Sequence, residues 1–195
     1  LNLMLILIKF LMSLLLERVN NMKFFKFSVT PYWLSIIPFL WDGHISMLLN
    51  YYFSPELFLS SHLFIIYLFI LTLSRPYNCS LLYLVCLGFL YDTYYFKTLG
   101  IVIITLPLLS YLFSQLLRFV KRNAYVDCLL AFLFLFLFDT LNFGFALYYG
   151  FTNEYISDFI IYQLSPSLVF NLLIFILIKP FVEKLFLYLS VDRFK

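Results

Sequence analysis

The most constraining feature of this sequence is a series of apolar stretches, each about 20 residues long, separated by short polar connections. As a helix, a stretch of that length crosses the hydrocarbon core of a bilayer. In a soluble fold most of these faces would meet water, because only 12% of the residues are charged and 64% are hydrophobic. The sequence therefore predicts an all-α membrane protein. We place its spans at residues 29–50, 57–74, 80–96, 100–119, 125–149 and 159–179.

The basic residues outside these spans gather on one side of the predicted bundle. The opposite side holds the acidic residues of the connections and a single basic residue, Lys97. Connections rich in Lys and Arg stay in the cytoplasm, so we predict a six-transmembrane-helix bundle with both termini cytoplasmic. The basic residues of the cytoplasmic side are Lys23, Lys26, Arg75, Arg118, Lys121, Arg122, Lys184, Arg193 and Lys195, and the acidic residues opposite are Glu56, Asp92, Glu154 and Asp158.

Residues 1–21 differ in sequence pattern from the rest of the chain. Met22 opens MKFFKF, which is typical of a bacterial start. The apolar run at 1–16 lacks the positive n-region and the A-x-A cleavage site of a signal peptide. We therefore expect residues 1–21 to be an N-terminal extension outside the fold. Residues 22–195 contain no internal repeat and no Gly/Ser-rich linker, which predicts a single membrane domain.

Polar side chains recur inside the predicted spans, where an ionisable group costs roughly 2.5–3.5 kcal/mol on insertion scales. Two interpretations are open: a ligand site or proton path lined by Asp42 and Asp139, or hydrogen bonds between helices that fix their packing. We favour the second, because no Lys, Arg or Glu at mid-depth completes a relay. The residues form stripes at i, i+4 and i+8 in spans one (Asp42, Ser46, Asn50) and six (Gln163, Ser167, Asn171), with Asp139 and Asn142 in span five.

No motif for catalysis, cofactor binding or metal binding occurs in the sequence. The three cysteines form no CxxC pair, and His44 and His62 are single. No basic run indicates a nucleic-acid partner. We predict neither an enzyme nor a bound cofactor or metal.

Two prolines and a glycine should modify the helices. Pro166 should kink span six, and a neighbouring side chain must bond the backbone group that this proline leaves free. Pro180 marks the point where that span leaves the membrane. Gly88 and Asp92 make span three the weakest helix former, so a broken segment is expected there.

Three segments together resemble the rod shape-determining protein MreD family, in the form found in Gram-positive cocci. They are IIPFLWDGHIS at 36–46, LGFLYDTYYFKTLG at 87–100 and LSPSLVFNLLIFILIKPFVEKLF at 164–186, in the family's order and spacing. The resemblance covers about residues 22–190 and leaves residues 1–21 without a counterpart. The residues that match the family pattern are Asp42, Gly43, Gly88, Asp92, Gly100, Pro166 and Asn171.

The resemblance implies a non-enzymatic scaffold of the cell-wall elongation machinery in the bacterial plasma membrane. Such a scaffold binds MreC, works beside RodA and its transpeptidase partner, and meets MreB only where the organism has it. It contributes to the regulation of cell shape and of peripheral peptidoglycan synthesis. The implied fold is similar to that of the substrate-binding subunits of energy-coupling-factor transporters. The matching residues carry no known catalytic role, and structural roles suit them: Gly88 for close helix approach, and Asp92 for capping or tying the loop before Gly100.

That similarity of fold leaves a rival open, namely a substrate-binding subunit of an energy-coupling-factor vitamin transporter. Such subunits usually dock their coupling protein through an Ala-x-x-x-Ala pattern on the first helix, and span one contains no Ala. The tyrosines Tyr94, Tyr95 and Tyr149 could nevertheless line a vitamin site. An intramembrane enzyme or lipid flippase would have only Asp42, Asp92 and Asp139 to use, and we give it little weight.

Overall fold

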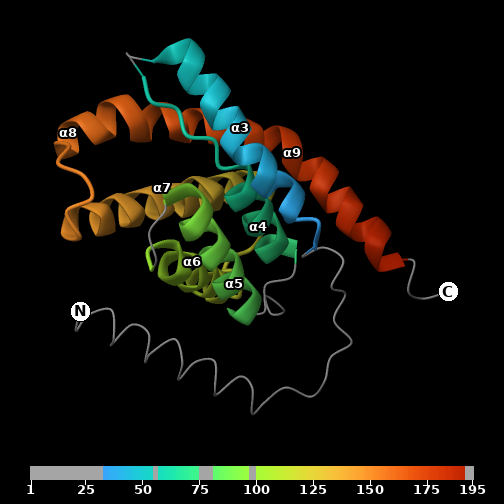
Figure 1. Ribbon diagram of the computed structural model, residues 1–195. Helices are drawn as coiled ribbons and strands as arrows, with labels where there is room; N and C mark the ends of the chain where they lie inside the picture. Colours follow the sequence, from blue (N-terminus) through green and yellow to red (C-terminus); the bar gives the residue numbers. More distant parts are fainter. Residues whose placement is uncertain (1–32, 55–56, 75–80, 97–99, 192–195) are drawn as a thin grey trace.

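The computed structural model describes residues 33–54, 57–74, 81–96 and 100–191, and every regular element in these ranges is a helix (Figure 1). The predicted all-α class is therefore confirmed. The expected extension at residues 1–21 lies outside the described residues, as do Lys23, Lys26, Glu56, Arg75, Lys97, Arg193 and Lys195. In chain order the elements are α3 (Ile36–Phe53), α4 (Leu63–Ser74), α5 (Leu81–Tyr91), the π-helix η1 (Asp92–Phe96), α6 (Val102–Leu116), α7 (Ala124–Tyr148), α8 (Ile156–Asp158), the π-helix η2 (Phe159–Leu164) and α9 (Ser165–Val191).

Helix α4 forms the centre of the bundle (Figure 1). Every residue from 64 to 73 is buried, because α4 is apolar on all sides and other helices surround it. The ring of Phe69 packs at 5.9, 4.8 and 5.9 Å from the rings of Phe113, Phe134 and Phe175, which belong to α6, α7 and α9. One short helix thus holds three others together.

The helix at α4 is shorter than the predicted span at 57–74. Its 12 residues rise only about 18 Å, whereas a bilayer core is about 30 Å thick. Residues 57–62, which we call the crossing segment, precede it without helical structure and run back along α3 (Figure 1). The expectation of one continuous helix over 57–74 is wrong, and the hydrogen bonds of the crossing segment described below give the reason.

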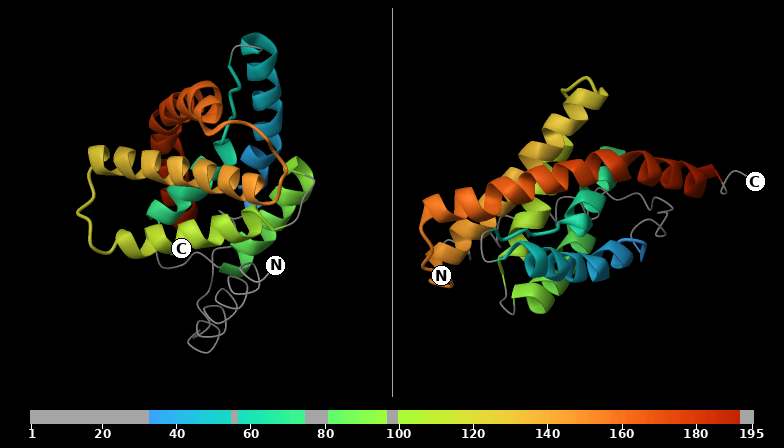
Figure 2. Two further views of the ribbon diagram at one scale, coloured as in Figure 1. Left: turned by 90° about the vertical axis from the view of Figure 1, so that its left-hand side faces the viewer. Right: turned by 90° about the horizontal axis from the view of Figure 1, so that it is seen from above.

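Two helical stretches are long and apolar enough to cross a membrane. They are Ala124–Tyr148, with 25 residues, and Ile156–Phe186, with 31. Only 33% and 28% of the most apolar 18-residue stretch of each helix is buried, so both helices present much apolar surface outwards. Helices α6 and α7 lie side by side (Figure 2). Helices α4 and α6 are apolar but shorter, and the six-span count stays a prediction.

The ends of spans three and six differ modestly from their predicted positions. Helix α9 continues through Pro180 to Val191, so this proline does not end the helix. The α-helix of span three changes to the π-helix η1 at Asp92, where a broken segment was expected.

Close contact between α5 and α6 depends on Gly88. A Cβ atom at this position would lie 2.7 Å from the Cα of Ile103 and 2.8 Å from the carbonyl oxygen of Val102. Both atoms belong to backbone, which cannot move aside as a flexible side chain can. Gly144 in α7 offers a contrast, because a Cβ atom there would have nothing within 4 Å.

We predict that Gly88→Ala lowers the free energy of unfolding by about 1–3 kcal/mol, because α5 and α6 must separate. Gly144→Ala, the matched control, should be neutral or stabilising by up to about 1 kcal/mol, since alanine is the better helix former. Denaturant unfolding in mixed micelles, followed by circular dichroism, measures both. Equal effects from the two substitutions would contradict the close packing at Gly88.

Candidate functional site

The crossing segment lies between α3 and α9, and its backbone has no helix or sheet to pair with. An unpaired backbone group in an apolar surrounding costs several kcal/mol, so each N–H needs a partner. Alternate residues of an extended chain point to opposite sides. In this structure the odd-numbered N–H groups bond to α3 and the even-numbered ones bond to η2 and α9.

The side towards α3 uses the whole polar stripe that the sequence predicts on that helix. Four residues of helix rise about 6.0 Å and two residues of extended chain rise about 6.6 Å, so the two spacings match along the stripe. The stripe therefore bonds to the backbone of a non-helical segment, where we had expected hydrogen bonds between helices. The bonds run from Leu59 N to Asn50 Oδ1 (2.9 Å), from Ser61 N to Ser46 Oγ (2.9 Å) and from Leu63 N to Asp42 Oδ1 (2.8 Å).

The side towards α9 uses two residues of the second stripe. Ser60 N donates to Ser167 Oγ at 3.0 Å, and His62 N donates to Asn171 Oδ1 at 2.9 Å. The amide of Asn171 also donates to the carbonyl oxygen of Ser60 at 2.8 Å. Asn171 therefore satisfies a donor and an acceptor of the crossing segment. Gln163, the third residue of the stripe, lines the neighbouring cavity instead.

Pro166 contributes to the same arrangement through the hydrogen bond that it cannot make. Because proline has no N–H, the carbonyl oxygen of Tyr162 lacks its usual partner four residues on. Phe58 N donates to this oxygen at 2.9 Å. The sequence predicts that a side chain compensates for Pro166, and this is wrong: the compensating group is backbone.

A half-open cavity of about 1040 Å³ lies beside the crossing segment. It brings together members of the polar sets that the sequence predicts in spans one, five and six, since Asp42, Asp139 and Gln163 all line it. The Nε2 atom of His62 lies 2.8 Å from Asp139 Oδ1, although sequence spacing gave His62 no partner. Asn142 also lines the cavity and accepts a hydrogen bond from Thr105 Oγ1 at 3.0 Å.

Tyr95 from η1 closes one wall of the cavity against α3. Its hydroxyl donates to the carbonyl oxygen of Phe39 at 2.6 Å and accepts from Gly43 N at 2.9 Å. A Cβ atom on Gly43 would lie 2.8 Å from Cε1 of Tyr95, so a larger residue would push the ring away. Glycine at 43 thus lets the tyrosine reach the α3 backbone.

Asp92 begins η1 and is fully buried beneath the first turn of α6. Its carboxylate accepts from the N–H groups of Gly100, Val102 and Ile103 at 2.9–3.2 Å. A carboxylate at a helix N-terminus also favours the positive end of the helix dipole. Gly100 has a φ of 116°, a value that side chains disfavour. These two residues fix where α6 begins.

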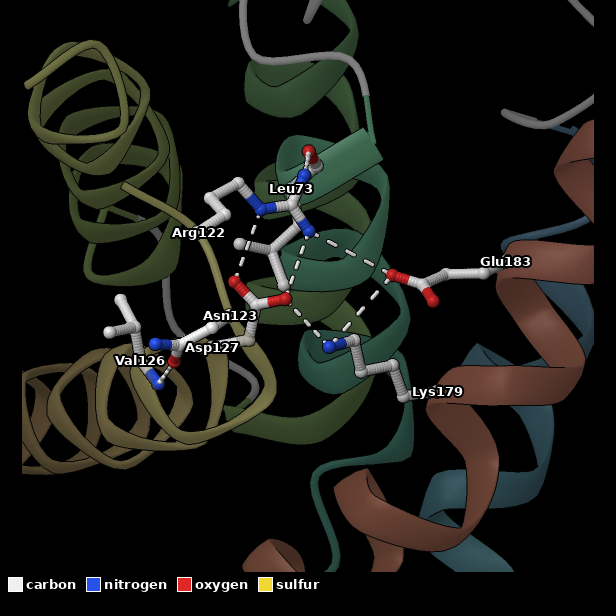
Figure 3. Close-up of polar contacts among 7 residues, drawn as sticks. All are labelled: Leu73, Arg122, Asn123, Val126, Asp127, Lys179 and Glu183. Atoms are coloured by element: carbon white, nitrogen blue, oxygen red, sulfur yellow. Dashed lines mark hydrogen bonds and ion pairs between the residues drawn. The ribbon is translucent and has the colours of Figure 1, made fainter. Parts of the chain in front are cut away.

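A second polar cluster joins α4, α7 and α9 at the other end of the bundle (Figure 3). Asp127 accepts two bonds from Arg122, at 3.1 and 3.0 Å, and its Oδ2 lies 2.6 Å from Nζ of Lys179. Arg122 also donates to the carbonyl oxygen of Leu73, near the end of α4, at 2.6 Å. Glu183 lies 3.8 Å from Arg122 and 4.0 Å from Lys179.

Sequence reasoning missed Asp127, although a local signal existed. Asn123 caps α7 by accepting from Val126 N at 2.8 Å, which places Asp127 in the first turn where an acid is favoured. The hydrogen bond with Asp127 raises the pKa of the Arg122 guanidinium, which stays charged. With two cations and two anions, the cluster is neutral as a whole.

The helices first indicate the general class of protein to which this chain belongs. Every regular element in the described ranges is a helix, and two helical stretches are long and apolar enough to cross a membrane while most of their residues are not buried, as in a membrane protein of the helical class. The family model described as rod shape-determining protein MreD matches residues 27–189. The chain therefore belongs to the MreD family, as its three motifs had indicated.

A curated relative supports the same assignment. The cell shape-determining protein MreD of Streptococcus pneumoniae strain R6 is 30% identical over 154 residues, which cover 78% of this chain and 93% of the relative. No solved structure matches this chain significantly.

We predict that Asn171→Ala destabilises the fold by about 2–5 kcal/mol, because it leaves His62 N–H and Ser60 C=O unpaired inside the bundle. Gln163→Ala on the same helix face removes no bond to the crossing segment and should cost less than about 1 kcal/mol. Thermal unfolding of both variants in detergent compares them. Similar losses would show that the crossing segment does not depend on Asn171.

We also predict that Asp127→Ala lowers stability by about 3–5 kcal/mol, because Arg122 and Lys179 lose their buried counter-charge. Glu154→Ala removes an exposed acid and should stay within about 0.5 kcal/mol of the parent. The same unfolding measurement applies, and a small effect at Asp127 would argue against the cluster as the link between α7 and α9.

Proposed function

We propose that this chain is a non-enzymatic membrane scaffold of the cell-wall elongation machinery, which binds MreC and contributes to the regulation of cell shape and peripheral peptidoglycan synthesis. The observation that carries the proposal is the family match over residues 27–189. The name of the pneumococcal relative, a cell shape-determining protein, points the same way.

The use of the polar side chains supports a scaffold over an enzyme. Asp42, Ser46, Asn50, Ser167 and Asn171 are engaged in bonds to the backbone of the crossing segment. Asp92 is likewise engaged at the start of α6. Side chains bound in this way hold shape, and a rigid shape is what a binding surface needs.

The proposed topology has six spans with both termini in the cytoplasm. Arg118 and Arg122 then lie on the cytoplasmic side, together with Lys184 near the end of α9. Glu154 and the cavity mouth lie on the outer side, where a single-span periplasmic partner would reach the chain.

Helix α3 offers the surface that we propose for MreC. It packs mainly against α4, and its outer face is apolar. Four large exposed side chains follow a helical stripe, roughly opposite the stripe that holds the crossing segment. They are Ile37, Trp41, Leu48 and Tyr52. A partner's membrane helix could pack along this stripe by shape complementarity. RodA, its transpeptidase partner and, where present, MreB would join the same assembly.

The cavity favours a second candidate function, a substrate-binding subunit of a vitamin transporter. Its volume of about 1040 Å³ is ample for a small molecule. Equilibrium binding of thiamine, riboflavin, folate and biotin to the purified chain discriminates between the two functions. Nanomolar affinity for any of them would favour the transporter.

Depleting the chain in its native host should round or shorten the cells and disperse MreC, because the scaffold that localises it is lost. Expression of the full chain should restore both, whereas a Trp41→Ala, Leu48→Ala double variant should fail to localise MreC. Leu173→Ala, an exposed apolar position on α9, serves as the control and should restore both. Fluorescence microscopy of labelled MreC gives the readout. Unchanged cell shape with MreC in place after depletion would contradict the proposal.

A further inference from the structure

The charges around the cavity are strongly one-sided. Three carboxylates line it, those of Asp42, Asp139 and Glu154, and none of the described residues that line it is Lys or Arg. Two histidines, His44 and His62, also line the cavity, and His62 forms its ion pair with Asp139; no ion pair of Asp42 within 4.0 Å occurs in the described part of the chain. A cavity of this kind in a low-dielectric surrounding attracts a cationic group.

Three buried atoms of residues that line the cavity have unused hydrogen-bonding capacity: Asp42 Oδ2, Ser61 Oγ and His62 Nδ1. Asp42 is 1% exposed, and while its Oδ1 accepts from Leu63 N, its Oδ2 has no well-aligned hydrogen bond. The Nδ1 atom of His62 is also buried and makes no hydrogen bond within the described part of the chain. A buried polar atom without a partner is costly and rare, so such atoms indicate a place for a ligand.

Aromatic rings complete the lining around these groups. The rings of Tyr91 and Tyr95 lie 4.7 Å apart, and Phe138 packs edge-on against both Tyr91 and His62. Ring faces attract cations, and ring edges accommodate apolar groups. The combination of carboxylates and rings suits a positive charge on an apolar body better than a hydrated metal ion. In agreement, no group of His, Cys, Asp and Glu suited to a metal occurs in the described ranges.

We propose that this cavity binds a protonated primary amine carried on an apolar body, with Asp42 Oδ2 accepting a hydrogen bond from the ammonium group and Tyr91 and Tyr95 flanking it. Two sources present this chemistry: the headgroup of an aminophospholipid from the surrounding bilayer, and a free aromatic or aliphatic amine. The proposal is independent of the scaffold function, because the cavity lies on the side of α3 that faces the crossing segment.

The test compares an amine with a neutral molecule of the same shape. The full chain in detergent is dialysed against labelled phenethylamine and, separately, against 2-phenylethanol, which replaces the amine by a hydroxyl. In a second arm, native mass spectrometry compares the retention of phosphatidylethanolamine with that of phosphatidylglycerol of identical acyl chains. The first arm reports a free amine, and the second reports a lipid headgroup.

Asp42→Asn is the decisive variant, because its side-chain oxygen can still accept from Leu63 N while the charge is lost. Asp158→Asn makes the same chemical change at an exposed residue that does not line the cavity. We expect at least a tenfold preference for the amine in one or both arms, abolished by Asp42→Asn and unchanged by Asp158→Asn. Ala146→Phe, which adds a bulky uncharged side chain to the cavity lining, should also abolish it.

The two arms distinguish a free amine from a lipid headgroup. A preference in the first arm alone identifies a free amine, and one in the second arm alone identifies the lipid headgroup. The absence of any preference for the amine in both arms overturns the proposal. So does a preference that persists in a folded Asp42→Asn variant or in Ala146→Phe, since binding would then not use Asp42 or would lie outside the cavity. If Asp42→Asn fails to fold, Ala146→Phe decides alone.

Discussion

The backbone of residues 57–62 must find hydrogen-bond partners without a helix or a sheet, and the rest of the bundle is arranged around that requirement. Non-helical backbone inside a membrane protein is tolerated only where protein groups satisfy it. Here two helices and one proline supply those groups. The stripe of α3, the stripe of α9 and the carbonyl freed by Pro166 each take a share of the N–H groups. A helix over the same residues would have needed none of them.

The crossing segment also explains why a cavity exists. It stands between α3 and α9 and takes the place of direct helix packing along that stretch. Helix α3 packs against α4, its polar stripe bonds to the backbone of the crossing segment, and Tyr95 bonds to the backbone of α3 itself. It leaves space towards α7. At the opposite end, the cluster around Asp127 ties α4, α7 and α9 together. One end of the molecule is closed by charge pairs, and the other is open and acidic.

Much of this could be predicted from the sequence, and the reasons for the misses are physical. The apolar stretches predict the helices, and the i, i+4, i+8 stripes identify Asp42, Ser46, Asn50, Ser167 and Asn171 as residues of one kind. Their partner could not be predicted, because residues 57–62 have the sequence LFLSSH and continue into the apolar run of α4. Ser60, Ser61 and His62 therefore look like a few polar residues inside one helix. The pairing of His62 with Asp139 was hidden as well, since it joins residues far apart in the chain. Asp127 was overlooked because it stands at a helix start and not on a stripe.

The alternation of bonds has a mechanical consequence. If the crossing segment slid by one residue, every N–H would point at the wrong helix, and all the bonds to both stripes would break together. A slide of two residues, about 6.6 Å, would restore the alternation but leave the groups at the end of the row without a partner, since the bonds to α3 use three residues and those to α9 use two. The row of bonds therefore opposes a small displacement of α3 along the crossing segment as a unit, because such a displacement would lengthen all of them together.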